Sequence, residues 1–252
     1  MKCEIIAVGT EVILGDILNS NAQYLAKELA NLGIDVYYHE AVGDNRERIL
    51  DCFKHSLDRS DIIITTGGLG PTKDDMTKEL AAEFFGMEMC LHEESLKKIK
   101  DYFKKMGREF VKSNEKQAYF PKEAIILDNE NGTAPGAIFE KNNKIIIVLP
   151  GPPKEMQPMF EKHVKKYLEK LTGETIVSEV LRVFGIGESL AENKLQDLID
   201  NGKNPTIAPY AKEGEVIFRL TAKAKSEEEA KNLIKPVKDE IYKRLGDAVY
   251  NT

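Results

Sequence analysis

The feature that most constrains the fold is an uninterrupted apolar run, Ile62-Ile-Ile-Thr-Thr66, which leads directly into the turn Gly67-Gly-Leu-Gly-Pro71. Apolar side chains at successive positions suit a strand that is buried on both faces, as in a parallel sheet. Similar short runs occur at residues 4–8, 34–38 and 144–149. Segments with helical spacing follow the runs in the first half of the chain. Consecutive strand–helix units of this kind predict a parallel sheet with right-handed crossovers.

Four helices are expected around this sheet. The first follows the capping residues Asn19-Ser-Asn21 and ends at Gly33, and the second begins at Asn45. The third is expected over residues 77–85 and the fourth over residues 154 to about 171. Residues 91–122 carry nine Lys or Arg against five Asp or Glu, which predicts a solvated helical excursion. The alternative for this stretch is a basic lid that faces phosphate.

The pattern changes near Leu171-Thr-Gly173. Strands are expected at residues 175–184, 216–222 and 247–250, with helices at 190–199 and 226–245. We therefore predict two domains, residues 1–171 and residues 172–252. The first is a three-layer α/β domain with a mostly parallel sheet, and the second is a small α+β domain.

Composition excludes several classes of function. The 252 residues include 36 basic and 42 acidic side chains, a net charge of −6, which argues against nucleic acid as a partner. No apolar stretch approaches the roughly 20 residues that span a bilayer, so no membrane partner is expected. The N-terminus has the pattern of a strand rather than a signal peptide. Three cysteines at wide spacing suggest neither a disulfide framework nor a thiol-ligated metal site. A cytoplasmic protein is the expectation.

Ligands of open parallel sheets bind beyond the carboxyl ends of the strands. Four of the expected strands end in loops that are rich in glycine, proline or acidic residues, so these loops predict one shared pocket. The loops are Gly9-Thr-Glu11, Val42-Gly-Asp44, Gly67-Gly-Leu-Gly-Pro-Thr-Lys-Asp-Asp75 and Pro150-Gly-Pro-Pro-Lys-Glu155.

The glycine turn can bring backbone N–H groups close to an anion at the start of a helix. It is neither a dinucleotide fingerprint nor a Walker loop, and a tight turn without any ligand would use the same glycines. The acids make the prediction more specific. Asp74 and Asp75 lie beside the turn, and Asp44 and Glu11 lie on neighbouring loops. Carboxylates repel phosphate unless a divalent cation lies between them, and magnesium commonly binds through carboxylates and substrate phosphates. The alternative is that Asp74 or Asp75 only caps the next helix.

A fifth loop, Asn131-Gly-Thr-Ala-Pro-Gly136, exposes its backbone and precedes an expected strand at residues 137–140. It is interpreted either as a loop that closes over a ligand or as a plain hairpin turn.

Together these motifs resemble the CinA family, the competence/damage-inducible protein A group, over roughly residues 1–170. The string Thr66-Gly-Gly-Leu-Gly-Pro-Thr-Lys-Asp-Asp-Met-Thr77 is the most specific part. The domain is similar to the molybdopterin-binding fold of the MoaB/MogA and gephyrin group. In that group a threonine stands where this chain has Leu69 and an arginine where it has Asp74. These differences favour a metal and a nucleotide over molybdopterin.

The resemblance implies a metal-dependent ADP-ribose pyrophosphatase that forms AMP and ribose 5-phosphate, with Mg, Mn or Co and also potassium as cofactors. Asp44 and Asp75 fall where the related group has functional aspartates. They are expected to bind the metal and to act in catalysis with Asp74. The expected substrate-binding residues, carried over from the motifs, are Glu11, Gly67, Gly68, Gly70, Thr72, Thr77, Gly132, Thr133, Gly136, Pro150, Gly151, Pro153 and Glu155.

Two other functions stay open: a molybdopterin-binding or adenylyl-transfer protein of the MoaB/MogA type, and a nucleotide-sensing module without turnover. Residues 173–252 look like the family's KH-like middle domain. Gly185-Ile-Gly-Glu188 departs from the Gly-x-x-Gly loop of KH domains, so a structural or dimerising role is expected. Many family members continue into a deamidase domain. This chain ends at Thr252 without it, so that activity is not predicted. A homodimer is expected from analogy, since two-fold dimers are the commonest closed assemblies.

Overall fold

The computed structural model describes residues 1–173, 175–212 and 214–250. The chain forms two compact units, one made of residues 1–30 and 34–167 and the other of residues 31–33 and 168–252. No helix in the described ranges has the length and apolar content needed to cross a membrane.

The first unit is built on a six-stranded sheet in the order β2-β1-β3-β8-β7-β6. The strands β1 (Lys2–Val8), β2 (Asp35–Val42), β3 (Ile62–Thr66) and β8 (Lys144–Leu149) are parallel. The strands β7 (Gly136–Lys141) and β6 (Ile125–Leu127) extend the sheet in antiparallel fashion. The prediction of a mostly parallel sheet is confirmed. The central strands are buried on both faces because they lie between two layers of helices.

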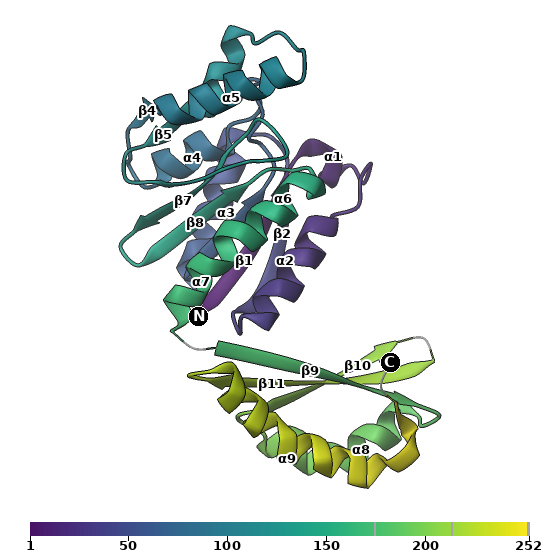
Figure 1. Cartoon of the computed structure of the whole chain (residues 1–252). Helices are drawn as coiled ribbons and strands as arrows, with labels where there is room; N and C mark the ends of the chain where they lie inside the picture. Colours follow the sequence, from purple (N-terminus) through teal and green to yellow (C-terminus); the bar gives the residue numbers. More distant parts are fainter. Residues whose placement is uncertain (174, 213, 251–252) are drawn as a thin grey trace. The chain divides into compact units, whose positions relative to one another are not determined.

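Helices α3 (Arg46–Arg59) and α4 (Thr77–Phe84) pack on one face of this sheet, where Phe53 and Leu80 join a core with Ile6 and Ile63. Helix α2 (Ser20–Asn31) and the segment α6 (Pro153–Met159), π-helix η2 (Phe160–Val164) and α7 (Lys165–Thr172) lie on the opposite side (Figure 1). The single helix expected over residues 154–171 is therefore interrupted. Pro158 has no N–H to donate within α6, and the π-helical turn follows it.

The charged stretch over residues 91–122 is partly helical, as expected, but it also contains strand. Helix α5 (Glu93–Lys105) and the 3₁₀ helix η1 (Lys112–Ala118) pack on each other through Leu96, Ile99 and Ala118. The strands β4 (Met89–Leu91) and β5 (Tyr119–Pro121) form a separate antiparallel pair at the base of the excursion. Strands of three residues are too short to show an alternating pattern, so neither these nor β6 was predicted.

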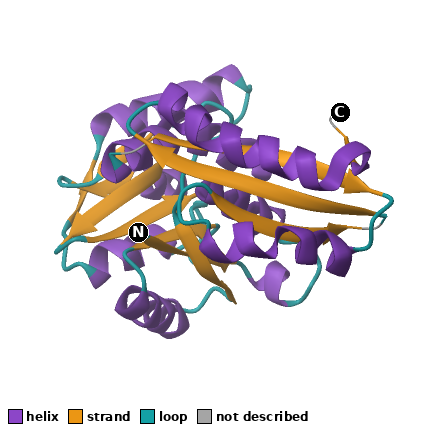
Figure 2. Cartoon of the chain, turned by 90° about the horizontal axis from the view of Figure 1, so that it is seen from below, coloured by secondary structure: helices purple, strands orange, loops and turns teal. Residues whose placement is uncertain are grey.

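The second unit is a four-stranded antiparallel sheet in the order β10-β11-β9-β12, with its helices on one face (Figure 2). Its strands are β9 (Thr175–Phe184), β10 (Thr206–Lys212), β11 (Glu215–Ala224) and β12 (Val249–Tyr250), and its helices are α8 (Glu188–Asn201), α9 (Glu227–Leu245) and the short η3 (Gly246–Ala248). Ser226 caps α9 by accepting a hydrogen bond from the Glu229 N–H. The strand β10 was missed because it contains Pro209, which cannot donate to a ladder.

Candidate functional site

The candidate site lies where the strand order of the sheet reverses, at β2, β1 and β3. The chain leaves β1 in one direction to form β2 and then returns to the other side of β1 to form β3. A crevice opens beyond the carboxyl ends of the strands at such a reversal. A pocket of about 410 Å³ lies there, bordered by Val8 at the end of β1, by Gly9, by the glycine turn after β3 and by Pro150 after β8. The predicted convergence of the four loops is confirmed.

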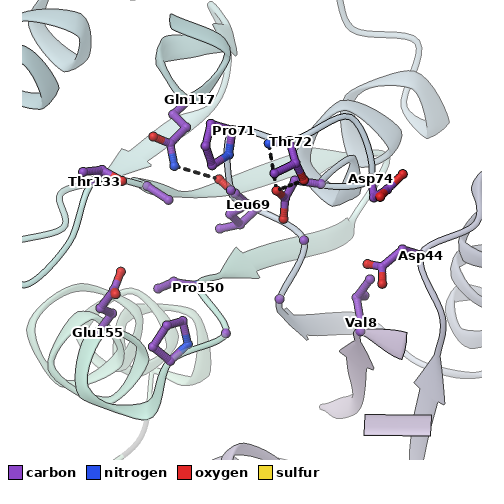
Figure 3. Close-up of a pocket in the computed structure, with 18 of the residues that line it drawn as sticks. Val8, Asp44, Leu69, Pro71, Thr72, Asp74, Gln117, Thr133, Pro150 and Glu155 are labelled. Carbon is purple, nitrogen blue, oxygen red and sulfur yellow. Dashed lines mark hydrogen bonds between the residues drawn. The ribbon is translucent and has the colours of Figure 1, made fainter. Parts of the chain in front are cut away.

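The lining of this pocket is acidic. Figure 3 shows Asp44 and Asp74 on one side and Glu155 on the opposite side. Asp75 and Glu11 complete a set of five carboxylates, and no Lys or Arg belongs to the described lining. The expected site residues that line it are Glu11, Asp44, Gly67, Gly68, Gly70, Thr72, Asp74, Asp75, Thr133, Pro150, Gly151 and Glu155.

The glycine turn has a conformation that other residues adopt with strain. Gly67 and Gly68 have φ angles of 107° and 67°. A Cβ atom on Gly67 would lie 2.0 Å from the Val8 carbonyl oxygen, and one on Gly68 would lie 2.0 Å from Thr77 Oγ1. The fold itself therefore requires these two glycines. Within the described chain, the N–H groups of Gly68, Leu69 and Gly70 donate to no protein acceptor, so three pocket-lining residues carry backbone donors without a protein partner.

Each of the two aspartates expected to bind metal accepts hydrogen bonds through one of its two carboxylate oxygens. Asp44 Oδ2 accepts hydrogen bonds from the N–H and the hydroxyl of Thr10, both at 3.0 Å. Asp75 Oδ2 accepts from the N–H of Thr72 at 3.0 Å and from its hydroxyl at 2.5 Å. The other carboxylate oxygen of each side chain has no partner among the residues described. Both aspartates are thus fixed in orientation and keep one oxygen for a ligand.

Helix capping does not explain the Asp74-Asp75 pair. The residue before α4 in the capping position is Met76, and no side chain of the described residues caps this helix. Asp75 instead closes the turn with Thr72, and Asp74 is exposed at the pocket with no hydrogen bond in the described part of the chain. The alternative that either aspartate only caps the next helix is wrong.

Side chains of the 3₁₀ helix η1 donate hydrogen bonds to backbone carbonyl oxygens of the glycine turn. The Lys116 ammonium donates to the carbonyl oxygens of Thr72, at 2.9 Å, and Asp75. Gln117 donates to the Leu69 carbonyl oxygen at 3.2 Å and lines the pocket. Lys78, which is buried in α4, donates to the carbonyl oxygens of Lys116 and Gln117 at 3.0 and 3.1 Å. Burial lowers the pKa of Lys78 to about 8.

The charged excursion is therefore neither a purely solvated stretch nor a basic lid. It supplies the support of the glycine turn, and its lysines do not line the pocket. Gln117 is a site residue that the sequence did not reveal, because nothing in a highly charged segment distinguishes one glutamine from its neighbours.

The loop of residues 131–136 is attached to the start of α6. Asn129 Nδ2 donates to Glu155 Oε2 at 2.8 Å and to the Ala134 carbonyl oxygen at 2.9 Å. Asn131 Nδ2 donates to the Lys154 carbonyl oxygen at 3.1 Å. The loop connects the antiparallel strands β6 and β7, and it also lines the pocket through Thr133 and Ala134. The hairpin connection is therefore confirmed, and closure of this loop over a ligand stays a prediction.

Four expected substrate-binding residues do not line the pocket. Thr77 is fully buried behind the turn, where its hydroxyl has no partner among described residues. Gly136 is buried in β7, where a Cβ atom would lie 2.6 Å from the Val148 carbonyl oxygen. Gly132 lies beside Glu155, facing a neighbouring cavity, and Pro153 borders another. Besides Gln117, the lining residues that were not named among the expected site residues are Val8, Gly9, Leu69, Pro71, Ala134 and Pro152.

Among the residues that the structure describes, no three His, Cys, Asp or Glu side chains form a ready-made metal cage. Magnesium is often held by one or two carboxylates together with substrate phosphates, so two oriented aspartates fit a metal that arrives with a phosphate ligand. The divalent metal stays a prediction.

Comparison with known proteins agrees with this architecture. Residues 4–170 match the family model "Probable molybdopterin binding domain", and residues 178–251 match "Damage-inducible protein CinA KH domain". The fold and the site thus define a molybdopterin-binding-type α/β domain joined to a KH-type domain.

The closely similar relatives carry one description. A competence-damage inducible protein of Clostridium perfringens is 63% identical over 251 residues, which are 99% of this chain and 61% of that protein. One of Clostridioides difficile is 58% identical over 250 residues, 99% of this chain and 60% of the relative. The crystal structure of the protein CinA from Thermoplasma acidophilum matches with a TM-score of 0.60 and 34% identity, covering 66% of this chain and 96% of that one. The chain belongs to the CinA family. It spans about three fifths of the length of the two competence-damage inducible proteins.

Proposed function

We propose that this chain hydrolyses the pyrophosphate of ADP-ribose, or of a similar nucleotide, to AMP and ribose 5-phosphate with the help of a divalent metal ion. The observation that carries the proposal is the lining of the pocket: five carboxylates, no basic side chain in the described lining, and three backbone N–H groups without a protein acceptor. Such a lining repels a bare phosphate and accepts one that is accompanied by a cation.

Asp44 and Asp75 are the residues proposed to hold the metal. Each has one oxygen committed to a threonine and one oxygen available, so neither side chain needs to reorganise when the ligand arrives. When bound, a divalent ion neutralises phosphate charge and acts as a Lewis acid at a phosphoryl oxygen. Potassium is an additional proposed cofactor that rests on the family resemblance.

The residues of the chain then have separable roles. The turn of Gly67, Gly68 and Gly70 places its backbone against the phosphates. Asp74 is exposed and has no hydrogen-bond partner among the described residues, so it can orient or deprotonate the attacking water. Hydrolysis adds the water oxygen to one phosphorus, breaks the bond between the bridging oxygen and that phosphorus, and leaves two phosphomonoesters.

A second candidate is a molybdopterin-binding or adenylyl-transfer protein, because residues 4–170 match a family described by molybdopterin binding. Against it, the acidic lining holds Asp74 and Leu69 at positions where the related group has arginine and threonine. A third candidate is a nucleotide sensor that binds without turnover.

One assay separates the three functions. The protein is incubated with ADP-ribose and Mg²⁺, Mn²⁺ or Co²⁺, with and without K⁺, and the products are separated by chromatography. The proposal predicts equal amounts of AMP and ribose 5-phosphate. Tight binding of ADP-ribose without any product would support a sensor, and binding of molybdopterin in its place would support the second candidate. The absence of AMP with every metal overturns the proposal.

A further inference from the structure

A second cavity of about 260 Å³ adjoins the acidic pocket in the first unit. Val8, Glu11, Gly151 and Pro152 line both this cavity and the acidic pocket, so the two spaces share one border. Its other walls come from the segment that follows β1, from the first turn of α2 and from the end of β3. Of its lining residues, Glu11, Gly151 and Pro153 were expected to bind substrate, whereas no binding role was expected for Asn21 or Thr66.

One buried side chain in this cavity is incompletely paired. Asn21 is 7% exposed, and its Nδ2 donates to the Gly151 carbonyl oxygen at 2.7 Å. This bond fixes which end of the amide is nitrogen. The Oδ1 atom is buried and accepts no hydrogen bond from any residue in the described ranges. A buried acceptor without a donor costs about 1–3 kcal/mol, so a ligand hydroxyl or N–H that reaches it removes a penalty.

The remaining walls define the chemistry of the ligand. Thr66, at the end of β3, is 4% exposed, and in the described part of the chain its hydroxyl makes no hydrogen bond. Glu11 is the single charged side chain in the described lining, so the cavity suits an uncharged group that bears hydroxyls. Ile17 and Leu18 border the cavity and are 51% and 91% exposed, which provides an apolar surface for a flat ring.

We infer that this cavity is the nucleoside subsite of the acidic pocket. The pentose of a nucleotide whose phosphates lie in the acidic pocket donates its hydroxyls to Asn21 Oδ1 and Thr66 Oγ1, and Glu11 accepts at the shared border. The base lies over Ile17 and Leu18. This inference rests on the proposed function for the phosphate position, and it adds the part of the substrate that is recognised and the residues that recognise it.

Binding measurements test the subsite without relying on turnover. AMP, 2′,3′-dideoxy-AMP, ribose 5-phosphate and inorganic pyrophosphate are titrated by calorimetry in the presence of Mg²⁺. The variants are Thr66→Val, which removes the hydroxyl and keeps the shape, and Asn21→Leu. The matched control is Thr65→Val, because Thr65 is its chain neighbour and donates to the Ile147 carbonyl oxygen at 3.5 Å, outside this cavity.

The wild type is expected to bind AMP about tenfold more tightly than dideoxy-AMP, the factor that corresponds to about 1.4 kcal/mol. In Thr66→Val and Asn21→Leu this preference shrinks several-fold, whereas pyrophosphate binds as in the wild type. Thr65→Val keeps the preference. If ribose 5-phosphate loses affinity in parallel with AMP, the cavity accepts either pentose of ADP-ribose; if AMP alone loses affinity, it accepts adenosine.

Two results overturn the inference. One is a wild type that binds AMP and dideoxy-AMP equally, which would mean that the cavity holds only water. The other is a Thr66→Val variant that discriminates as the wild type does. Failure of pyrophosphate to bind the wild type would count instead against the acidic pocket as a phosphate site, so the two proposals fail in different ways.

Discussion

Gly67 provides the most quantitative test of the turn that borders the site. Replacement by alanine places a Cβ atom 2.0 Å from the Val8 carbonyl oxygen and 3.1 Å from its carbon, and both atoms are backbone. A residue held at a φ of 107° costs about 1–3 kcal/mol in strain. Relief of the overlap by a backbone shift costs another 1–3 kcal/mol or so. The Gly67→Ala variant is therefore expected to lose about 2–6 kcal/mol of unfolding free energy.

Urea unfolding followed by circular dichroism measures this loss, with the transition of the first unit as the readout. Gly151→Ala is the matched control, because Gly151 lies next to Gly67 in the lining of the same pocket. Its Cβ atom would lie 3.6 Å from Gly67 Cα, an ordinary contact, so its stability is expected within about 0.5 kcal/mol of the wild type. If Gly67→Ala unfolds at the same urea concentration as the wild type and Gly151→Ala, the conformation assigned to the turn is refuted.

Three further predictions concern the groups around the turn. Asp75→Asn keeps an oxygen that accepts from the Thr72 N–H and hydroxyl, so the unfolding free energy is expected to change by about 1 kcal/mol or less. Metal-dependent AMP formation is expected to fall at least about 100-fold. Wild-type turnover in this variant would contradict the metal assignment. Lys116→Met removes the donor to the Thr72 and Asp75 carbonyl oxygens, so the rate of amide hydrogen exchange over residues 69–76 is expected to rise. The rise is expected to be smaller in Lys116→Arg. Lys112→Met, which alters an exposed residue of the same helix, is expected to exchange as the wild type does. Burial lowers the pKa of Lys78 to about 8, against about 10.4 in an unfolded chain, so the unfolded state binds more protons between these two pH values. The unfolding free energy of the wild type is therefore expected to rise with pH in this range, by roughly 3 kcal/mol relative to Lys78→Met. Equal pH profiles of the two proteins in urea unfolding would show that Lys78 is not desolvated.

Residues 62–66 and 144–149 were predictable because burial on both faces leaves a continuous apolar run, which sequence periodicity detects. The convergence of the glycine and acidic loops followed from one topological rule about the ends of parallel strands. The caps Asn45 and Ser226 were also predictable, because a capping bond is local: their side chains accept from the N–H groups of Arg48 and Glu229.

Other features depend on contacts between distant segments. Gln117 reaches the glycine turn from a helix 48 residues away, and no periodicity encodes that contact. Asn21 looked like one of three capping residues, yet Asn19 provides the cap by accepting from the Ala22 N–H, and Asn21 bonds to Gly151 across 130 residues. Gly136 and Thr77 matched family motifs, but their positions serve packing rather than the pocket.

The expected homodimer and the absence of nucleic acid as a partner stay predictions. The mass of the protein in solution by light scattering tests the first, since a monomeric mass would contradict it. The second follows from the net charge of −6. A gel-shift assay at low salt is expected to show no binding.

The central claim is that Asp44 and Asp75 hold a metal ion against the pyrophosphate of a nucleotide. The most direct test is the release of AMP from ADP-ribose by the wild type and Asp44→Asn in parallel, each with Mg²⁺ and with excess EDTA. We expect AMP from the wild type with Mg²⁺ and almost none from the other three samples. AMP that forms equally fast in EDTA, or equally fast with Asp44→Asn, would contradict the claim.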